Sequence, residues 1–137
     1  MTMTISTAAR SARMTSFVTS LGASATAKFF NGSKPASLGT PAGTLLATLT
    51  YGTDVTVANG GTAGGVTSGV LTLGGVTQTN SAHVAGTPTF VRFSTSGGVV
   101  VADIDIAAGA GNVQFSGTVA VNQNVTATGV TLTDGNA

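Results

Sequence analysis

Few residues of this chain could carry out chemistry. His83 is the only histidine and the chain has no cysteine, which excludes histidine metal clusters, thiolate zinc sites and cysteine nucleophiles. A Ser-His-Asp triad would have to be built around His83, and the segment Asn80–His83 contains no nucleophile motif. We therefore interpret His83 as a solvent-exposed loop residue.

Asp103 and Asp105 are the second candidate pair. One residue separates them, so on a strand both carboxylates lie on the same face. Such a pair could bind Ca²⁺ or act as general acid and base, but the chain has only four acidic residues to complete a site. We expect both side chains to be solvated and to discourage pairing at a sheet edge.

Pairs of glycines suggest phosphate-binding loops, but no pair is followed by the Lys-Ser/Thr of a P-loop and none begins a helix within a βαβ unit. We interpret them as turns. They occur at Gly60-Gly61, Gly64-Gly65, Gly74-Gly75 and Gly97-Gly98. The sequence thus contains no active site that we can identify, and we expect neither a cofactor nor a bound metal.

The basic residues are unevenly distributed. Residues 1–53 contain four basic residues and no acid (net +4), whereas residues 54–137 contain Arg92 and four aspartates (+1 − 4 = −3). This asymmetry could align protomers with one another or attach the N-terminal part to an acidic surface. Arg10, Arg13 and Phe17 are our candidate interface residues, and the alternative for the arginines is a solvated helix face. Without a groove-binding motif, these charges do not indicate nucleic-acid binding.

Residues 6–21 have the pattern of the one predicted helix. Ser6 or Thr7 can cap its N-terminus and Gly22 can end it. Its apolar stripe has helical spacing. The stripe can pack on the domain's own core or, alternatively, belong to an arm that docks on a neighbour. The stripe consists of Met14, Phe17, Val18 and Leu21.

From residue 25 the hydrophobic period changes to two, which is typical of strands with one buried face. The clearest alternations start at Leu45, Val100, Val113 and Val130, and shorter strands are predicted at residues 25–30, 54–58, 69–73 and 88–94. A loop with Pro35 and Pro41 spans Asn31 to Gly43.

About eight short strands with frequent turns predict an all-β fold, an antiparallel β-sandwich or jelly roll with one short N-terminal helix. We divide the chain into an N-terminal helical arm, residues 1–22, and a β-sandwich domain, residues 23–137. Ile104 is assigned to the buried face, so Ile104→Ala should cost about 2–5 kcal/mol. Asp103→Ala, on the opposite face, should cost less than about 0.5 kcal/mol.

The composition favours a protein that works in an assembly. Charged residues make up 7% of the chain, far below the typical ~25%, so Thr, Ser, Asn and Gly must cover its surface. Its net charge of +1 gives little self-repulsion. No run of apolar residues reaches the ~18 that a membrane span requires.

Several phrases, in order, resemble a family of small bacteriophage virion structural proteins. The similarity covers most of the chain, and its specificity comes from the order of phrases that are individually common. Residues 90–93 differ from the family pattern, which usually has a larger aromatic residue and more charge there. The phrases are Ser6–Arg10, Lys28–Gly32, Lys34–Ser37, Gly43–Leu49, Phe90–Ser94, Val100–Asp103 and Val130–Gly135.

The resemblance implies a non-enzymatic component of the virion, assembled in the host cytoplasm, with a capsid decoration or cement protein as the expected role. Its partners would be the major capsid protein or other virion proteins, without nucleic acid or membrane. We also expect a homo-oligomer, a dimer or trimer, because neutral strand edges need covering. The alternative is a tail, neck or baseplate component; an adhesin or pilus module would require an export segment that we do not find.

Overall fold

The computed structural model describes residues 4–51, 84–106 and 119–121 with their side chains, and five further strands by their backbone. Helix α1 (Thr7–Leu21) precedes the strands. The principal sheet contains β1 (Thr26–Phe30), β2 (Leu45–Thr50), β6 (Phe90–Ser94) and β7 (Val100–Asp105). The strands described by their backbone are β3 (Val66–Thr67), β4 (Val70–Leu73), β5 (Val76–Gln78), β8 (Val125–Ala127) and β9 (Val130–Thr133).

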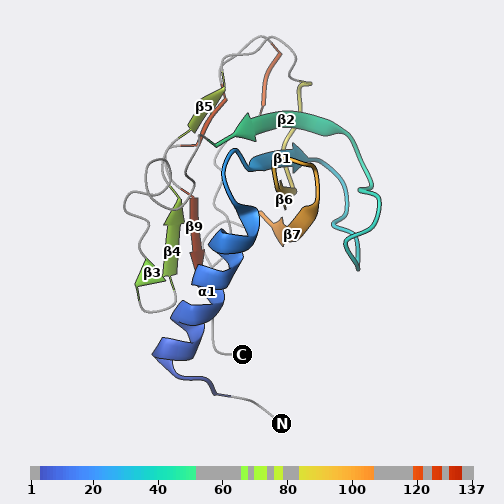
Figure 1. Cartoon of the computed structure of the whole chain (residues 1–137). Coiled ribbons are helices and arrows are strands. Elements are labelled where there is room, and N and C mark those ends of the chain that lie inside the picture. The colour runs from blue at the N-terminus through green and yellow to red at the C-terminus, as the bar shows by residue number, and fades with distance from the viewer. Residues whose placement is uncertain are drawn as a thin grey trace.

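The principal sheet has the order β2-β1-β6-β7, and each neighbouring pair is antiparallel (Figure 1). Two smaller antiparallel sheets have the orders β3-β4-β9 and β5-β8. Helix α1 contacts β3 and β4 of the three-stranded sheet as well as β7 of the principal sheet. The described chain is therefore mostly antiparallel β with one short N-terminal helix, as the sequence predicts.

Local sequence signals set both ends of α1. The Ser6 side chain caps the helix by accepting a hydrogen bond from the backbone N–H of Ala9 at 3.2 Å. Gly22 ends it with a φ of 68°, a left-handed conformation that favours glycine, and donates its N–H to the carbonyl of Val18. These are the boundaries predicted from the sequence.

The apolar stripe of α1 packs on the core of this chain. Val18 and Leu21 are buried, and Met14 and Phe17 are partly buried against the same cluster. Of the two alternatives for the stripe, the structure therefore shows packing on the chain's own core.

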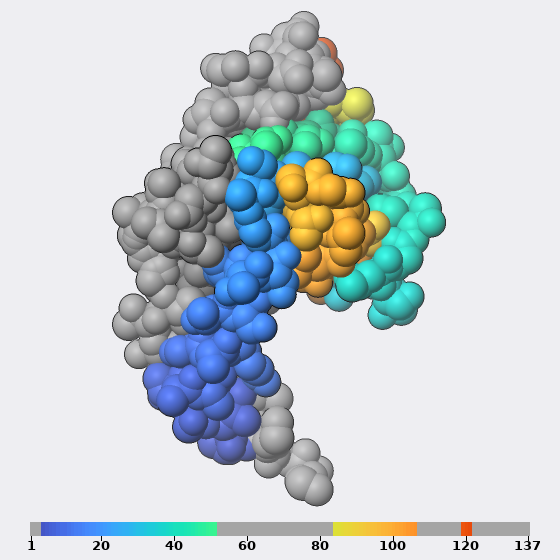
Figure 2. All heavy atoms as spheres, in the orientation of Figure 1, coloured from blue at the N-terminus to red at the C-terminus, as the bar shows by residue number. Residues whose placement is uncertain are grey.

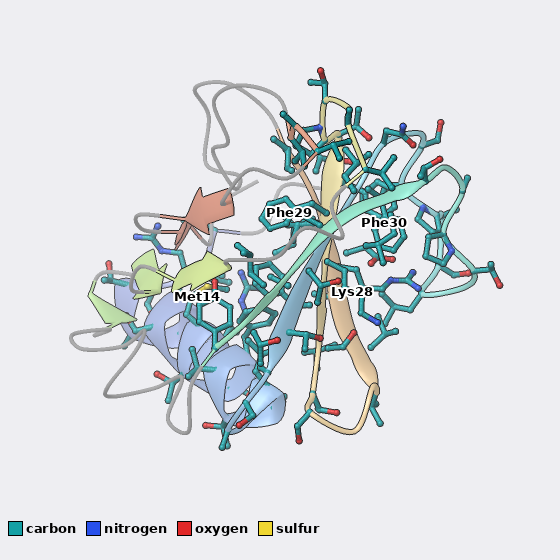
Figure 3. All side chains as sticks on the ribbon, turned by 90° about the horizontal axis from the view of Figure 1, so that it is seen from above. Met14, Lys28, Phe29 and Phe30 are labelled. Carbon is teal, nitrogen blue, oxygen red and sulfur yellow. The ribbon has the colours of Figure 1, made fainter. Side chains whose placement is uncertain are left out.

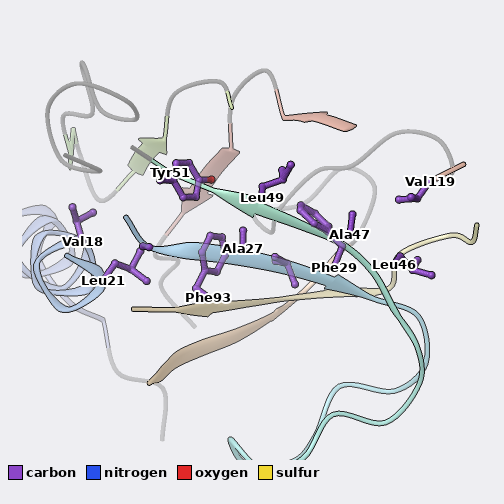
Figure 4. Packing of buried hydrophobic residues seen from close by; sticks show 12 residues of the cluster. Val18, Leu21, Ala27, Phe29, Leu46, Ala47, Leu49, Tyr51, Phe93 and Val119 are labelled. Atoms are coloured by element: carbon purple, nitrogen blue, oxygen red, sulfur yellow. The ribbon is translucent and has the colours of Figure 1, made fainter. Parts of the chain in front are cut away.

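One face of the principal sheet supplies most of that core (Figure 4). In β1, Ala27 and Phe29 point into it, and their cross-strand neighbours in β6 are Phe93 and Val91. This alternation is what the period of two predicts. The buried cluster consists of Val18, Leu21, Ala25, Ala27, Phe29, Leu46, Ala47, Leu49, Tyr51, Val91, Phe93 and Val119.

A β-bulge interrupts the predicted alternation at the start of β2. The sequence pattern places Leu45 in the buried face, but Leu45 is 39% exposed and Leu46 is 1% exposed. The register with β1 shifts between Phe29, which pairs with Ala47, and Phe30, which pairs with Leu45. One extra residue in β2 thus moves Leu46 into the core.

Bulging also affects β7. The register with β6 shifts between Phe93 and Ser94. Strict alternation would place Val101 on the face opposite Ile104, yet Val101 packs partly against the core. Ile104 packs on the core as predicted but is only partly buried.

The strands predicted at residues 25–30, 69–73 and 88–94 correspond to β1, β4 and β6, and the segment beginning at Val130 corresponds to β9. The strand predicted at residues 54–58 lies outside the described residues. So does most of the alternation that starts at Val113, although Val119 forms an isolated antiparallel bridge with Gly86.

The bulge in β2 can be tested with two adjacent leucines. Leu46→Ala should lower the free energy of unfolding by about 2–5 kcal/mol, because it empties a buried site. Leu45→Ala should change it by about 0.5 kcal/mol, because that side chain already contacts water. Urea denaturation of both variants measures the difference. A larger loss for Leu45→Ala would show that Leu45, and not Leu46, faces the core, as uninterrupted alternation predicts.

Tyr51, the only tyrosine, offers a second test of the core. Its side chain is 1% exposed, and its hydroxyl has no hydrogen-bond partner among the described residues. Burial raises the pKa of the phenol well above its ordinary value of ~10, because the ionised form would lose its hydration. Above about pH 10 the unfolded chain therefore loses a proton that the folded chain keeps.

The free energy of unfolding should consequently decrease as the pH rises above about 10, and Tyr51→Phe should flatten that decrease. At neutral pH, Tyr51→Phe should be as stable as the wild type or more stable, since it removes an unpaired buried hydroxyl. Urea denaturation at neutral and alkaline pH measures both effects. A loss of about 1–3 kcal/mol at neutral pH would show that the hydroxyl is hydrogen-bonded.

Candidate functional site

The face of the principal sheet that points away from the core, here called the second face, contains most of the polar groups in the sheet. Figure 3 shows Lys28 and Phe30 on this side of β1, opposite Phe29 and Met14. Lys28 is flanked across the strands by Thr48 of β2 and Arg92 of β6. The loop 31–44 is tied to the β6–β7 side of the second face.

A buried ion pair joins β6 and β7 on the second face. Arg92 donates from Nε to Asp103 Oδ1 at 2.7 Å and from Nη2 to Oδ2 at 2.6 Å. The two side chains are 9% and 3% exposed. The two residues are cross-strand partners in the hairpin, so the strand pairing itself brings the groups together.

The same guanidinium holds the loop. Arg92 Nη2 also donates to the backbone carbonyl of Gly39 at 2.7 Å. The hydrogen bonds to Asp103 raise the pKa of Arg92 above its already high ordinary value, so the group stays charged. One side chain therefore connects the hairpin to the middle of the loop.

The base of the loop 31–44 is closed by backbone contacts. The Asn31 N–H donates to the Thr44 carbonyl at 3.1 Å, and the Thr44 N–H donates to Asn31 Oδ1 at 2.6 Å. Gly43 has a φ of 94°, and a Cβ there would collide with the Asn31 carbonyl, so this close approach requires glycine. Thr89 adds hydrogen bonds from its N–H and Oγ1 to the Phe30 carbonyl.

Beneath the loop, Phe30 and Phe90 stack with ring centroids 5.2 Å apart and an interplanar angle of 9°. At the side of the loop, Lys34 Nζ lies 3.6 Å from Asp105 Oδ2. Figure 2 shows the loop, in turquoise, standing out from the side of the molecule next to the orange hairpin. Leu38, which is 52% exposed, lies on it. The contacts thus hold an exposed loop in one position.

The prediction that Asp103 is solvated was wrong. Asp103 does lie on the opposite face from Ile104, as the alternation indicates, but its side chain is 3% exposed and its carboxylate is paired with Arg92. Asp105 fits the prediction better, since its side chain is 56% exposed. The sequence did contain a signal for the pair: Arg92 and Asp103 lie at equal distances on either side of the Gly97-Gly98 turn.

The three predicted interface residues lie on α1 in different surroundings. Arg13 is exposed. Arg10 is half-buried, and its Nη2 lies 3.4 Å from Thr7 Oγ1. Phe17 is turned toward the sheet, where its ring meets that of Phe93 edge to face at 5.8 Å and 82°. The structure therefore places Phe17 in contact with the chain's own core.

Other candidates from the sequence fall partly outside the described residues, including His83 and the first three glycine pairs. Gly97-Gly98 forms the turn between β6 and β7, with Gly98 at a φ of 85°. The described part of the chain has no group of three His, Cys, Asp or Glu residues arranged to bind a metal. Nor does any helix in that part have the length and apolar character needed to cross a membrane.

The contribution of the ion pair to stability can be measured with two aspartates. Asp103→Ala should lower the free energy of unfolding by about 3–5 kcal/mol, because it leaves the Arg92 guanidinium buried without a counter-charge. Asp105→Ala, at the exposed pair with Lys34, should cost about 0.5 kcal/mol. Equal losses in urea denaturation would mean that the Asp103 carboxylate is accessible to water.

A double variant separates loss of the pair from burial of a lone charge. Arg92→Met with Asp103→Leu should be more stable than Asp103→Ala alone, because it removes both charges and keeps apolar volume. A double variant less stable than the single one would show that the contacts of Arg92 with Asp103 and with the Gly39 carbonyl together stabilise the fold by more than it costs to bury the charges.

Comparison with known proteins adds no further constraint. No protein-family model matches the sequence, and no curated protein or solved structure is significantly similar to it.

Proposed function

We propose that this chain is a non-enzymatic structural protein of a bacteriophage virion, and that it is a capsid decoration or cement protein that binds the assembled head and stabilises it. The observation that carries the proposal is that the buried ion pair fixes the position of an exposed loop. Arg92 and Asp103 hold an exposed loop through Gly39. A surface fixed before binding loses little conformational entropy on docking, which favours association with a rigid lattice.

The surface chemistry and the sequence resemblance support the same class. Charged residues make up 7% of the chain, which suits protein–protein contacts made by hydroxyl, glycine and apolar groups. The proposal includes no enzymatic activity, cofactor, nucleic acid or membrane. The partners are the major capsid protein or other virion proteins.

We include in this proposal a two-layer fold and a homo-oligomer. In a β-sandwich or jelly roll, the smaller sheets would form the second layer over the core face of the principal sheet. The contacts of α1 with both the principal and the three-stranded sheet support this arrangement. A dimer or trimer would cover strand edges such as that of β7, the last strand in the order of the principal sheet.

A cement protein stabilises the head by mass action. A protein that binds only the assembled lattice shifts the assembly equilibrium toward it, even if each copy binds weakly. Contacts with several capsid subunits at one junction add to this effect, because the lattice fixes their spacing.

The test uses particles that lack this protein. Heat or osmotic rupture is compared before and after purified protein is added back, and the copies bound are counted by gel densitometry. We expect many copies per particle and rupture only under harsher conditions. Unchanged rupture, or a few copies restricted to the tail, would reject the cement role; the second outcome would support the tail, neck or baseplate alternative.

The structure indicates which variants of α1 can test its role in docking without disturbing the core. Deleting residues 1–22 would remove Val18 and Leu21 from the core, so loss of binding by that variant would be ambiguous. Arg10→Ala and Arg13→Ala instead change the basic side of the helix. If these arginines steer docking, both variants should bind more slowly at low salt, with a smaller effect at high salt. Unchanged binding rates would leave Arg10 and Arg13 without a docking role.

A further inference from the structure

Among the described residues, the polar contacts that tie the loop 31–44 to the second face lie on its β6–β7 half. There the Gly39 carbonyl accepts a hydrogen bond from Arg92 of β6, and Lys34 pairs with Asp105 of β7. The other half belongs to β1 and β2. Four of its residues, Thr26, Lys28, Thr48 and Thr50, are here called the open half; Thr50 is exposed and the other three are half-buried.

Lys28 is the charged residue of the open half. The carboxylate nearest to it by register, that of Asp103, is engaged through both oxygens by Arg92. No ion pair or hydrogen bond joins the Lys28 ammonium to another described residue. Lys28 is therefore a half-buried lysine without a counter-charge among the described residues, next to an arginine whose charge Asp103 already balances.

The neighbours of Lys28 are suited to binding a carboxylate within a protein surface. Thr48 is its cross-strand partner, and Thr26 and Thr50 form the adjacent pair on the same face, so residues with hydroxyl donors neighbour Lys28. Threonine side chains are stiff at χ1, which lowers the entropy lost when they are ordered. Leu45, 39% exposed, adds an apolar contact at the rim of this half.

We infer that the open half is a docking surface for an acidic segment of a capsid protein, with Lys28 pairing with a carboxylate of that segment and the threonines donating hydrogen bonds around it. This inference rests on the proposed function and names the surface and the chemistry of its partner. Charge complementarity selects the occupant, because the open half offers a cation and hydroxyl groups but no acid.

The experiment measures binding of purified protein to particles that lack it. Lys28→Gln and Lys34→Gln are compared, since both remove one lysine and leave the same net charge. Lys28→Gln should weaken binding roughly tenfold or more, and its affinity should depend less on salt than that of the wild type. Lys34→Gln, on the other half of the second face, should bind nearly as the wild type does.

A second variant tests the open half without changing a half-buried residue. Thr50 is exposed, and Thr50→Glu adds a negative charge to the open half that should repel the acidic segment or occupy Lys28. It should reduce binding as strongly as Lys28→Gln, and circular dichroism melts of both variants should match the wild type.

The outcomes separate the two proposals. If the wild type does not bind the particles, the proposed function fails and this inference falls with it. If the wild type binds, and Lys28→Gln and Thr50→Glu bind equally well, the cement role stands and the open half is rejected as the docking surface. An equal loss for Lys28→Gln and Lys34→Gln would likewise reject it, because the effect would then reflect net charge rather than position.

Discussion

A guanidinium removed from water must be paired, and this requirement organises one side of the molecule. Arg92 meets it with Asp103 across the β6–β7 hairpin and with the carbonyl of Gly39 in the loop. The hairpin register, the position of the loop and the extent of the open half consequently depend on one another. A slip of one residue between the strands would turn Asp103 to the core face and leave Arg92 without its counter-charge.

The parts of the fold that could be predicted from sequence are those fixed by local signals. Ser6 and Gly22 set the helix ends, and alternation alone assigns Ala27 and Phe29 to the core. Leu46 could not be placed this way. Its burial depends on a bulge that accommodates the chain as it returns from the loop, and such a long-range constraint leaves no trace in the spacing of neighbouring residues.

The candidate site, too, depends on long-range contacts that local sequence patterns do not reveal. Alternation identified the face on which Asp103 lies, but exposure depends on what covers that face, and the loop comes from a segment more than fifty residues earlier in the chain. Phe17 has the spacing and size of an interface residue, yet the same properties suit its contact with Phe93. The sequence pattern did not predict the open half, because that surface depends on how two strands pair and on where the loop is attached.

The contact between Arg92 and Gly39 allows the side chains of the loop to vary. The acceptor is a backbone carbonyl, which every amino acid possesses, so the anchor does not depend on the side chain at that position. At the base of the loop, by contrast, the close approach of Gly43 to Asn31 restricts substitution. Mutation can therefore diversify the exposed residues between these points, including Leu38, while the loop keeps its path, and the contact surface can change its specificity without rebuilding the sheet beneath it.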